Sequence, residues 1–107
     1  MILRLTHLLI LLAFATRLYS QSLTVGLSEN KPLKGFTAKQ TPDGIFVELL
    51  NYIAKEEKWE LNYVSMNFNE CLVALENGEI DIMPDLGKSN ERCTKYKFNS
   101  EEVILTW

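Results

Sequence analysis

The order of strand-like and helix-like segments limits this chain to few folds. Residues 23–28 and 60–66 carry the branched and alternating apolar side chains of strands, and residues 80–83 form a short apolar segment after a helix stop. Between them, residues 45–58 and 68–77 repeat apolar side chains at helical spacing. Strands that alternate with helices predict an α/β fold with a mostly parallel sheet, because parallel neighbours need a crossover connection between them.

Capping signals predict where the second helix begins and ends. Asn67 is a favourable N-terminal cap, and Glu70 three residues later completes a capping-box pattern. Gly78 stands where helices commonly end in a left-handed residue. Farther along, residues 97–99 predict the start of another strand.

The beginning of the chain has the pattern of a secretory signal. Arg4 precedes an apolar run over residues 8–15, which is short for a membrane-spanning helix. We therefore expect residues 1–20 to be a signal peptide and the protein to be exported, with an uncleaved N-terminal anchor as the alternative. The apolar ending over residues 102–107 predicts that the sequence is the front of a longer protein, because natural termini are usually surface segments.

Charge and residue types narrow the possible functions. The net charge is −3 without a basic run, which argues against a nucleic-acid surface. The single histidine, His7, lies in the expected signal, so neither a Ser/His/Asp triad nor a His/Cys metal cluster can form in the remaining chain. Asp81 and Asp85 have no accompanying base. We expect a protein that is not an enzyme and needs no cofactor or metal.

The two cysteines, Cys71 and Cys93, lack a metal-like spacing. Export would permit a disulfide between them. Both lie on expected helices, however, where a small buried thiol is the commoner role. We expect free thiols, with a bridge as the alternative.

Candidate binding residues follow the expected strands. Ligands of open α/β sheets lie outside the carboxyl ends of the strands, which here are residues 28–31, 66–68 and 84–88. Arg92 follows closely, and its guanidinium can hold a carboxylate through two parallel bonds. Phe68 offers an apolar face to a ligand. This combination predicts a site for a small zwitterion or carboxylate.

Each of these side chains has a structural alternative. Arg92, in a short helix capped by Ser89, could instead form a surface ion pair with Asp85 or Glu91. Phe68 could be a core or staple contact at a helix start. Asp85 could hold a ligand amine, neutralise Arg92 or be a solvated loop acid.

Four blocks of sequence resemble the first lobe of family 3 extracellular solute-binding proteins. The blocks are Thr24-Val25-Gly26, Gly44-Ile45-Phe46-Val47-Glu48-Leu49-Leu50, Leu75-Glu76-Asn77-Gly78-Glu79-Ile80-Asp81, and Glu91-Arg92 followed by Lys97-Phe98-Asn99. The resemblance implies a two-lobed periplasmic-binding-protein type 2 fold that closes over small solutes, typically amino acids. Residues 22–107 would then be a partial domain, the N-terminal lobe, with the second lobe missing from this chain.

The resemblance also implies site roles. The residue that matches Arg92 grips the ligand carboxylate, and the aromatic that matches Phe68 packs on the ligand. The family usually has hydroxyl residues where this chain has Asp85 and Gly87, and a threonine at Ser89. Asn30, after the first strand, completes the expected set of ligand-binding residues.

Residues 82–85 look more like the branch of the family that forms sensor domains of histidine kinases and diguanylate cyclases. We therefore expect the sensory input part of a signalling protein, with a membrane-anchored signalling partner. The alternatives are the substrate-binding component of an ABC amino-acid importer, with an ABC permease as partner, and a carboxylate-dependent enzyme on the same fold.

Overall fold

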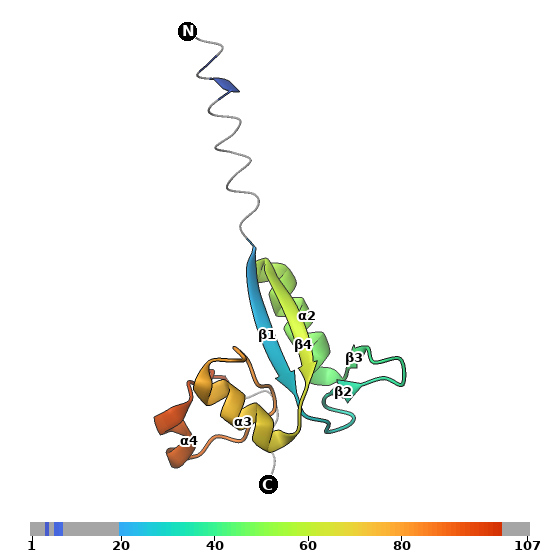
Figure 1. The fold of residues 1–107 in the computed structure, drawn as a ribbon, viewed down its shortest axis with the longest axis vertical. Coiled ribbons are helices and arrows are strands. Elements are labelled where there is room, and N and C mark those ends of the chain that lie inside the picture. Colours follow the sequence, from blue (N-terminus) through green and yellow to red (C-terminus); the bar gives the residue numbers. More distant parts are fainter. Residues whose placement is uncertain (1–3, 5, 8–19, 102–107) are drawn as a thin grey trace.

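The computed structural model describes residues 4, 6, 7 and 20–101 of the chain. Its elements alternate between strand and helix along the main part of the chain, with a small hairpin inserted after the first strand (Figure 1). In chain order they are β1 (Gln21–Leu27), β2 (Gly35–Phe36), β3 (Pro42–Asp43), α2 (Ile45–Glu57), β4 (Trp59–Ser65), α3 (Phe68–Asn77) and α4 (Asn90–Lys95). The expected α/β fold is confirmed.

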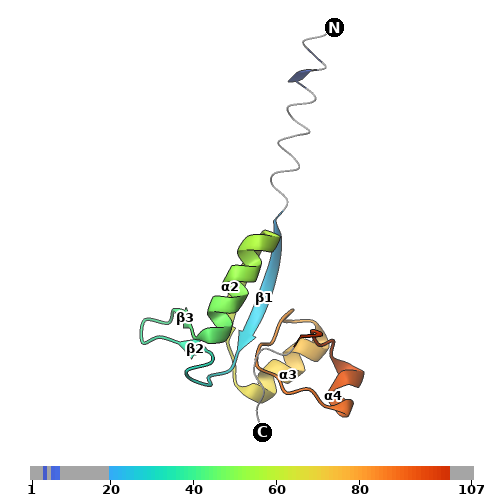
Figure 2. The same cartoon turned by 180° about the vertical axis from the view of Figure 1, so that it is seen from behind.

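The main sheet consists of β1 and β4, which pair in parallel from Gln21 opposite Trp59 to Leu27 opposite Ser65. Helix α2 makes the crossover between them and covers one face of the pair, as Figure 2 shows from behind. Buried Val25 and Leu27 of β1 pack against Val47 of α2. The amphipathic spacing of α2 therefore serves to cover β1, as the sequence pattern predicts.

The segment expected to form a third strand lies in the predicted place but is not a strand. It makes a single parallel bridge, between Ile82 and Val25, on the edge of β1 that β4 does not occupy. Gly26 N donates to Ile82 O at 3.0 Å, and Ile82 N donates to Thr24 O at 3.2 Å. The ladder ends there because Pro84 has no N–H to donate and Asp85 takes a left-handed φ of 62°.

Gly26 allows α3 and the segment after it to approach β1 closely. Because strand side chains alternate, its missing side chain faces away from Val25 and Leu27. A Cβ there would lie 2.6 Å from Ile80 Cδ1 and 3.1 Å from Cys71 Sγ. Cys71 and Ile80 belong to a second buried cluster on this side of β1.

The capping predictions are confirmed. The Asn67 side chain accepts a hydrogen bond from Glu70 N at 2.8 Å, and the Asn67 amide donates to the Glu70 carboxylate. Gly78 ends α3 with a φ of 76°. Helix α2 ends at Glu57, one residue earlier than expected, because Lys58 adopts a left-handed φ of 58°.

The strand predicted to begin over residues 97–99 is wrong for these residues. None of the backbone hydrogen bonds between described residues involves them, so they have no neighbouring strand within the described chain.

The apolar ending over residues 102–107 and most of the expected signal peptide lie outside the described residues. Within residues 4, 6, 7 and 20–101, no helix is long and apolar enough to cross a membrane.

Both cysteines are free, as expected. Cys71 is buried in α3, but the expectation of a buried thiol is wrong for Cys93, which is exposed on α4. Burial raises the pKa of the Cys71 thiol, so this side chain behaves as a small apolar core residue.

We predict that Gly26→Ala lowers the free energy of unfolding by about 1–3 kcal/mol, because the added methyl group overpacks the contact with Ile80 and Cys71. Urea-induced unfolding of the two proteins measures the difference. Gly87→Ala is the matched control, since its Cβ would meet only Arg92 Nη1, at an ordinary 3.5 Å. Equal destabilisation by both substitutions would contradict the close approach at Gly26.

Candidate functional site

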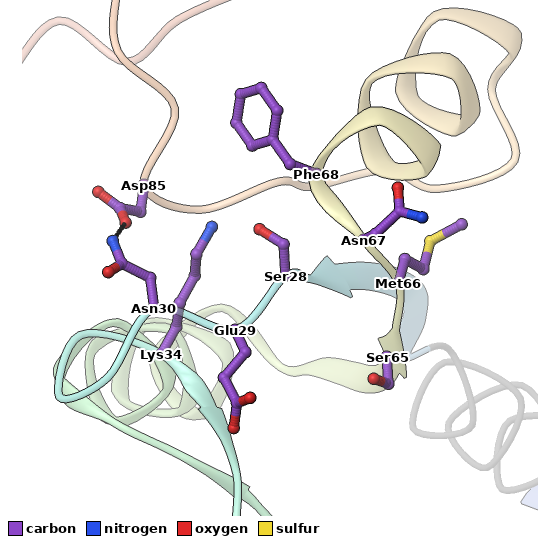
Figure 3. A pocket seen from close by; sticks show the side chains of 9 residues that line it. All are labelled: Ser28, Glu29, Asn30, Lys34, Ser65, Met66, Asn67, Phe68 and Asp85. Atoms are coloured by element: carbon purple, nitrogen blue, oxygen red, sulfur yellow. Dashed lines mark hydrogen bonds between the residues drawn. The ribbon is translucent and has the colours of Figure 1, made fainter.

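A pocket of about 550 Å³ opens at the carboxyl ends of β1 and β4 (Figure 3). Three loops and the first turn of α3 supply its walls. The lining residues are Ser28, Glu29, Asn30, Lys34, Ser65, Met66, Asn67, Phe68 and Asp85. This is where parallel sheets place their ligands, and the pocket contains residues from all three strand-end segments named from the sequence.

Asn30 connects the first loop to the loop after Ile82. Its backbone closes a tight turn, because Asn30 O accepts from Leu33 N at 2.9 Å and from Lys34 N at 3.0 Å. The side chain is then free to reach across the pocket, where Nδ2 donates to Asp85 Oδ2 at 2.7 Å (Figure 3). Asn30 therefore orients the Asp85 carboxylate.

Arg92 lies in the first turn of α4, with its guanidinium over the Phe68 ring, 5.8 Å from the centroid. Its Nη1 donates to Gly87 O at 2.8 Å, and its backbone N donates to Ser89 Oγ at 3.1 Å. Gly87 and Ser89 thus contact the arginine through a carbonyl and a helix cap. Four of the five guanidinium N–H donors have no acceptor among the described residues.

The ion-pair alternative for Arg92 is wrong. Within the described chain, Arg92 forms no salt bridge with Asp85 or Glu91, and the pair between Lys31 and Glu29 is the one salt bridge found. The core alternative for Phe68 is also wrong, because its side chain is 40% exposed and lines the pocket. The Arg92 guanidinium therefore lies over a ring that lines the pocket, whereas Arg92, Gly87 and Ser89 are not among the lining residues themselves.

Asp81 and Asp85 do not act as a pair. The Asp81 carboxylate accepts a hydrogen bond from Thr24 N at 2.8 Å, beside β1, and Asp81 does not line the pocket. Among residues 4, 6, 7 and 20–101, no group of histidine, cysteine or acidic side chains is placed to hold a metal ion. The arrangement presents binding groups around a cavity.

Comparison with protein families places residues 23–104 in the bacterial extracellular solute-binding proteins, family 3. The chain belongs to this family. The match spans most of the sequence, so the resemblance seen in the four sequence blocks is confirmed. The name of the family describes extracellular proteins that bind solutes.

A solved structure agrees with this assignment. The crystal structure of the probable amino-acid ABC transporter extracellular-binding protein ytmK from Bacillus subtilis superposes with a TM-score of 0.70 at 28% sequence identity. The match covers 78% of this chain and 37% of the Bacillus chain, so this chain spans well under half the length of that relative. The fold is that of a periplasmic-binding-protein lobe. None of the curated proteins compared matches the chain.

Sequence reasoning missed Lys34, which is a buried residue of the solute-binding lobe. Lys34 is only 2% exposed, and its Nζ donates to Pro84 O at 2.9 Å. Burial lowers the pKa of Lys34, and the nearby Asp85 carboxylate partly opposes this shift. Lysine is rarely buried, and nothing in the local sequence distinguishes Lys34 from exposed Lys31.

We predict that the Lys34→Met variant gains stability over the parent protein at neutral pH and that the difference shrinks at alkaline pH. The pKa of Lys34 in the folded state is below its ordinary value of 10.5, so the unfolded chain binds more protons between these two values. The stability of the parent relative to the variant therefore rises with pH across this window.

Urea unfolding of the two ligand-free proteins at several pH values from 7 to about 10.5 measures this difference. Tyr63, whose pKa burial raises, is present in both proteins and cancels to first order in the comparison. A pH-independent difference would show that burial does not perturb the Lys34 amine.

Proposed function

We propose that this chain supplies the N-terminal lobe of an exported protein that binds a small solute carrying a carboxylate. The observation that carries the proposal is the guanidinium of Arg92, which has no salt-bridge partner among the described residues and lies over Phe68, a residue that lines the pocket. A cation that no acidic side chain of residues 20–101 neutralises is available to an anionic ligand. The pocket is open, so a second lobe would form the opposite wall of the cleft.

Each expected site residue has a role in this proposal. Arg92 holds the solute carboxylate through its free N–H groups, and Phe68 packs against the apolar part of the solute. Asp85 accepts from a solute amine, while Asn30 keeps its carboxylate in place. Gly87 and Ser89 orient Arg92 through the bonds described above.

The proposed solute is an amino acid or a related carboxylate, and the proposed partner is an ABC permease. The Bacillus relative supports this choice, because its name describes an extracellular-binding protein of an amino-acid ABC transporter.

A sensor domain would use the same pocket but a membrane-anchored signalling partner. That alternative rests on residues 82–85 alone. An enzyme is disfavoured, since Asp81 is engaged with β1.

We predict that Arg92→Ala reduces affinity for the bound solute at least about tenfold, because charge-assisted hydrogen bonds to the carboxylate are lost. The measurement is the ligand-induced rise in Tm, followed by calorimetry, across a panel of amino acids and simple carboxylates. Arg92→Lys should bind the solute more tightly than Arg92→Ala but more weakly than the parent. Lysine keeps the positive charge but cannot form the two parallel hydrogen bonds of a guanidinium group.

Lys95→Ala is the matched control, because it removes a cation from the same short helix without removing a described contact. It should leave affinity unchanged. An Arg92→Ala protein that binds its solute as tightly as the parent would refute the carboxylate role.

We further propose that residues 1–20 are removed on export, which leaves residues 22–107 in the recognition domain. Intact-mass spectrometry of the protein secreted by its own host should then show the loss of a segment ending close to Ser20 or Ser22. Recovery of the protein with Met1 at its N-terminus would favour an uncleaved anchor instead.

A further inference from the structure

Lys34 is the one buried cation that lines the pocket among the described residues. An ammonium group has three N–H donors, and the structure provides a hydrogen-bond acceptor, Pro84 O, for one of them. In Figure 3 the Lys34 nitrogen points up into the space between Asp85 and Ser28. Two strong donors therefore have no acceptor among residues 20–101 and remain for an acceptor that enters this space.

The surroundings of Lys34 favour an acceptor with negative charge. Ser28 is 7% exposed and directs its hydroxyl into the same space, where it adds another donor (Figure 3). Glu29 does not neutralise Lys34, because its carboxylate pairs with Lys31 at 3.2 Å and its side chain is 66% exposed. The Lys34 ammonium and the Ser28 hydroxyl thus offer more hydrogen-bond donors than the described acceptor, Pro84 O, can satisfy.

The charges of the side chains around the pocket also favour a negatively charged solute. Asp85 lies close enough to Lys34 to oppose the lowering of its pKa, so these two side chains offset each other. Arg92, which lies over Phe68 and has no salt-bridge partner among the described residues, leaves the described part of the site with an excess positive charge. A solute with a net negative charge would complete this balance, whereas a neutral zwitterion would leave the buried ammonium partly unsatisfied.

We propose that Lys34 Nζ binds a second acidic group of the solute, so that the pocket prefers an acidic amino acid or a dicarboxylate over its neutral amide counterpart. The inference rests on the proposed function, because Arg92 holds the first carboxylate. Lys34 and Ser28 then donate hydrogen bonds to the second acidic group of the solute. A carboxylate there receives charge-assisted bonds, which are stronger than those to a neutral carbonyl.

Calorimetry on the protein expressed from its gene tests the inference with two isosteric pairs of solutes. The pairs are L-glutamate with L-glutamine and L-aspartate with L-asparagine, which differ in the charge of the terminal group. We expect the acidic member of at least one pair to bind about tenfold or more tightly than the amide member.

Substitution of Lys34 tests the assignment to this side chain. Lys34→Met should weaken binding of the acidic solute about tenfold or more relative to binding of the amide solute, so that the preference disappears. Lys39→Met is the matched control, because Lys39 is an exposed lysine of the same polar loop. It should keep the parental preference.

Three outcomes would overturn the inference. The first is a parent protein that binds both members of each pair equally or prefers the amides, which needs no variant and so does not depend on the folding of Lys34→Met. The second is a preference that survives in Lys34→Met. The third is binding of other amino acids but none of these four solutes, which would leave the proposed function intact. Failure of every amino acid and carboxylate to bind would overturn the proposed function as well.

Discussion

The structure depends on β1, because both edges of its backbone are hydrogen-bonded. On one edge it pairs with β4 along its whole length, and on the other it pairs with Ile82. The side chains of Val25 and Leu27 are buried under α2, while the absence of a side chain at Gly26 admits Ile80 on the opposite face. One short strand thus fixes the relative positions of α2, α3 and the segment after α3.

The pocket follows from this pairing. The neighbours of β1 run parallel to it, so the loops that leave their carboxyl ends emerge at one edge of the sheet. Two further hydrogen bonds then tie the first loop to the third, from Asn30 to Asp85 and from Lys34 to Pro84. The pocket walls are therefore held to one another as well as to the sheet, which keeps the binding groups in fixed positions.

Much of this arrangement could be predicted from the sequence, because it depends on local signals. Helix α3 begins at its Asn67 cap and ends at Gly78, and both signals act between residues that are close in sequence. The apolar side chains of α2 recur at helical spacing, so the buried face of this helix is also visible in the local sequence. The location of the site followed from the strand order, and Asn30, Phe68 and Asp85 do line the pocket.

The parts that could not be predicted depend on contacts between distant segments. Whether residues 80–83 extend a ladder depends on the backbone after Ile82, where Pro84 and the left-handed Asp85 turn the chain away. Lys34 is buried because the loop containing Pro84 folds over it from 50 residues farther along the chain. A sequence that contains exposed lysines nearby gives no sign of that contact.

Three features that cost stability lie at the pocket. They are not confined to it, because Gln40 and Lys58 are also left-handed and Tyr52 is more exposed than Phe68. Lys34 keeps an amine in a desolvated position, Asp85 adopts a left-handed backbone conformation and Phe68 leaves an aromatic ring partly exposed. The caps, the apolar stripes and the buried clusters of the described chain agree with the local sequence. Local exceptions in an otherwise consistent fold commonly mark functional sites. Two of these three would be relieved by a solute, since an anion would stabilise the lysine and an apolar chain would cover the ring. The same groups that weaken the empty lobe would therefore strengthen the occupied one, which couples binding to the ordering of the site.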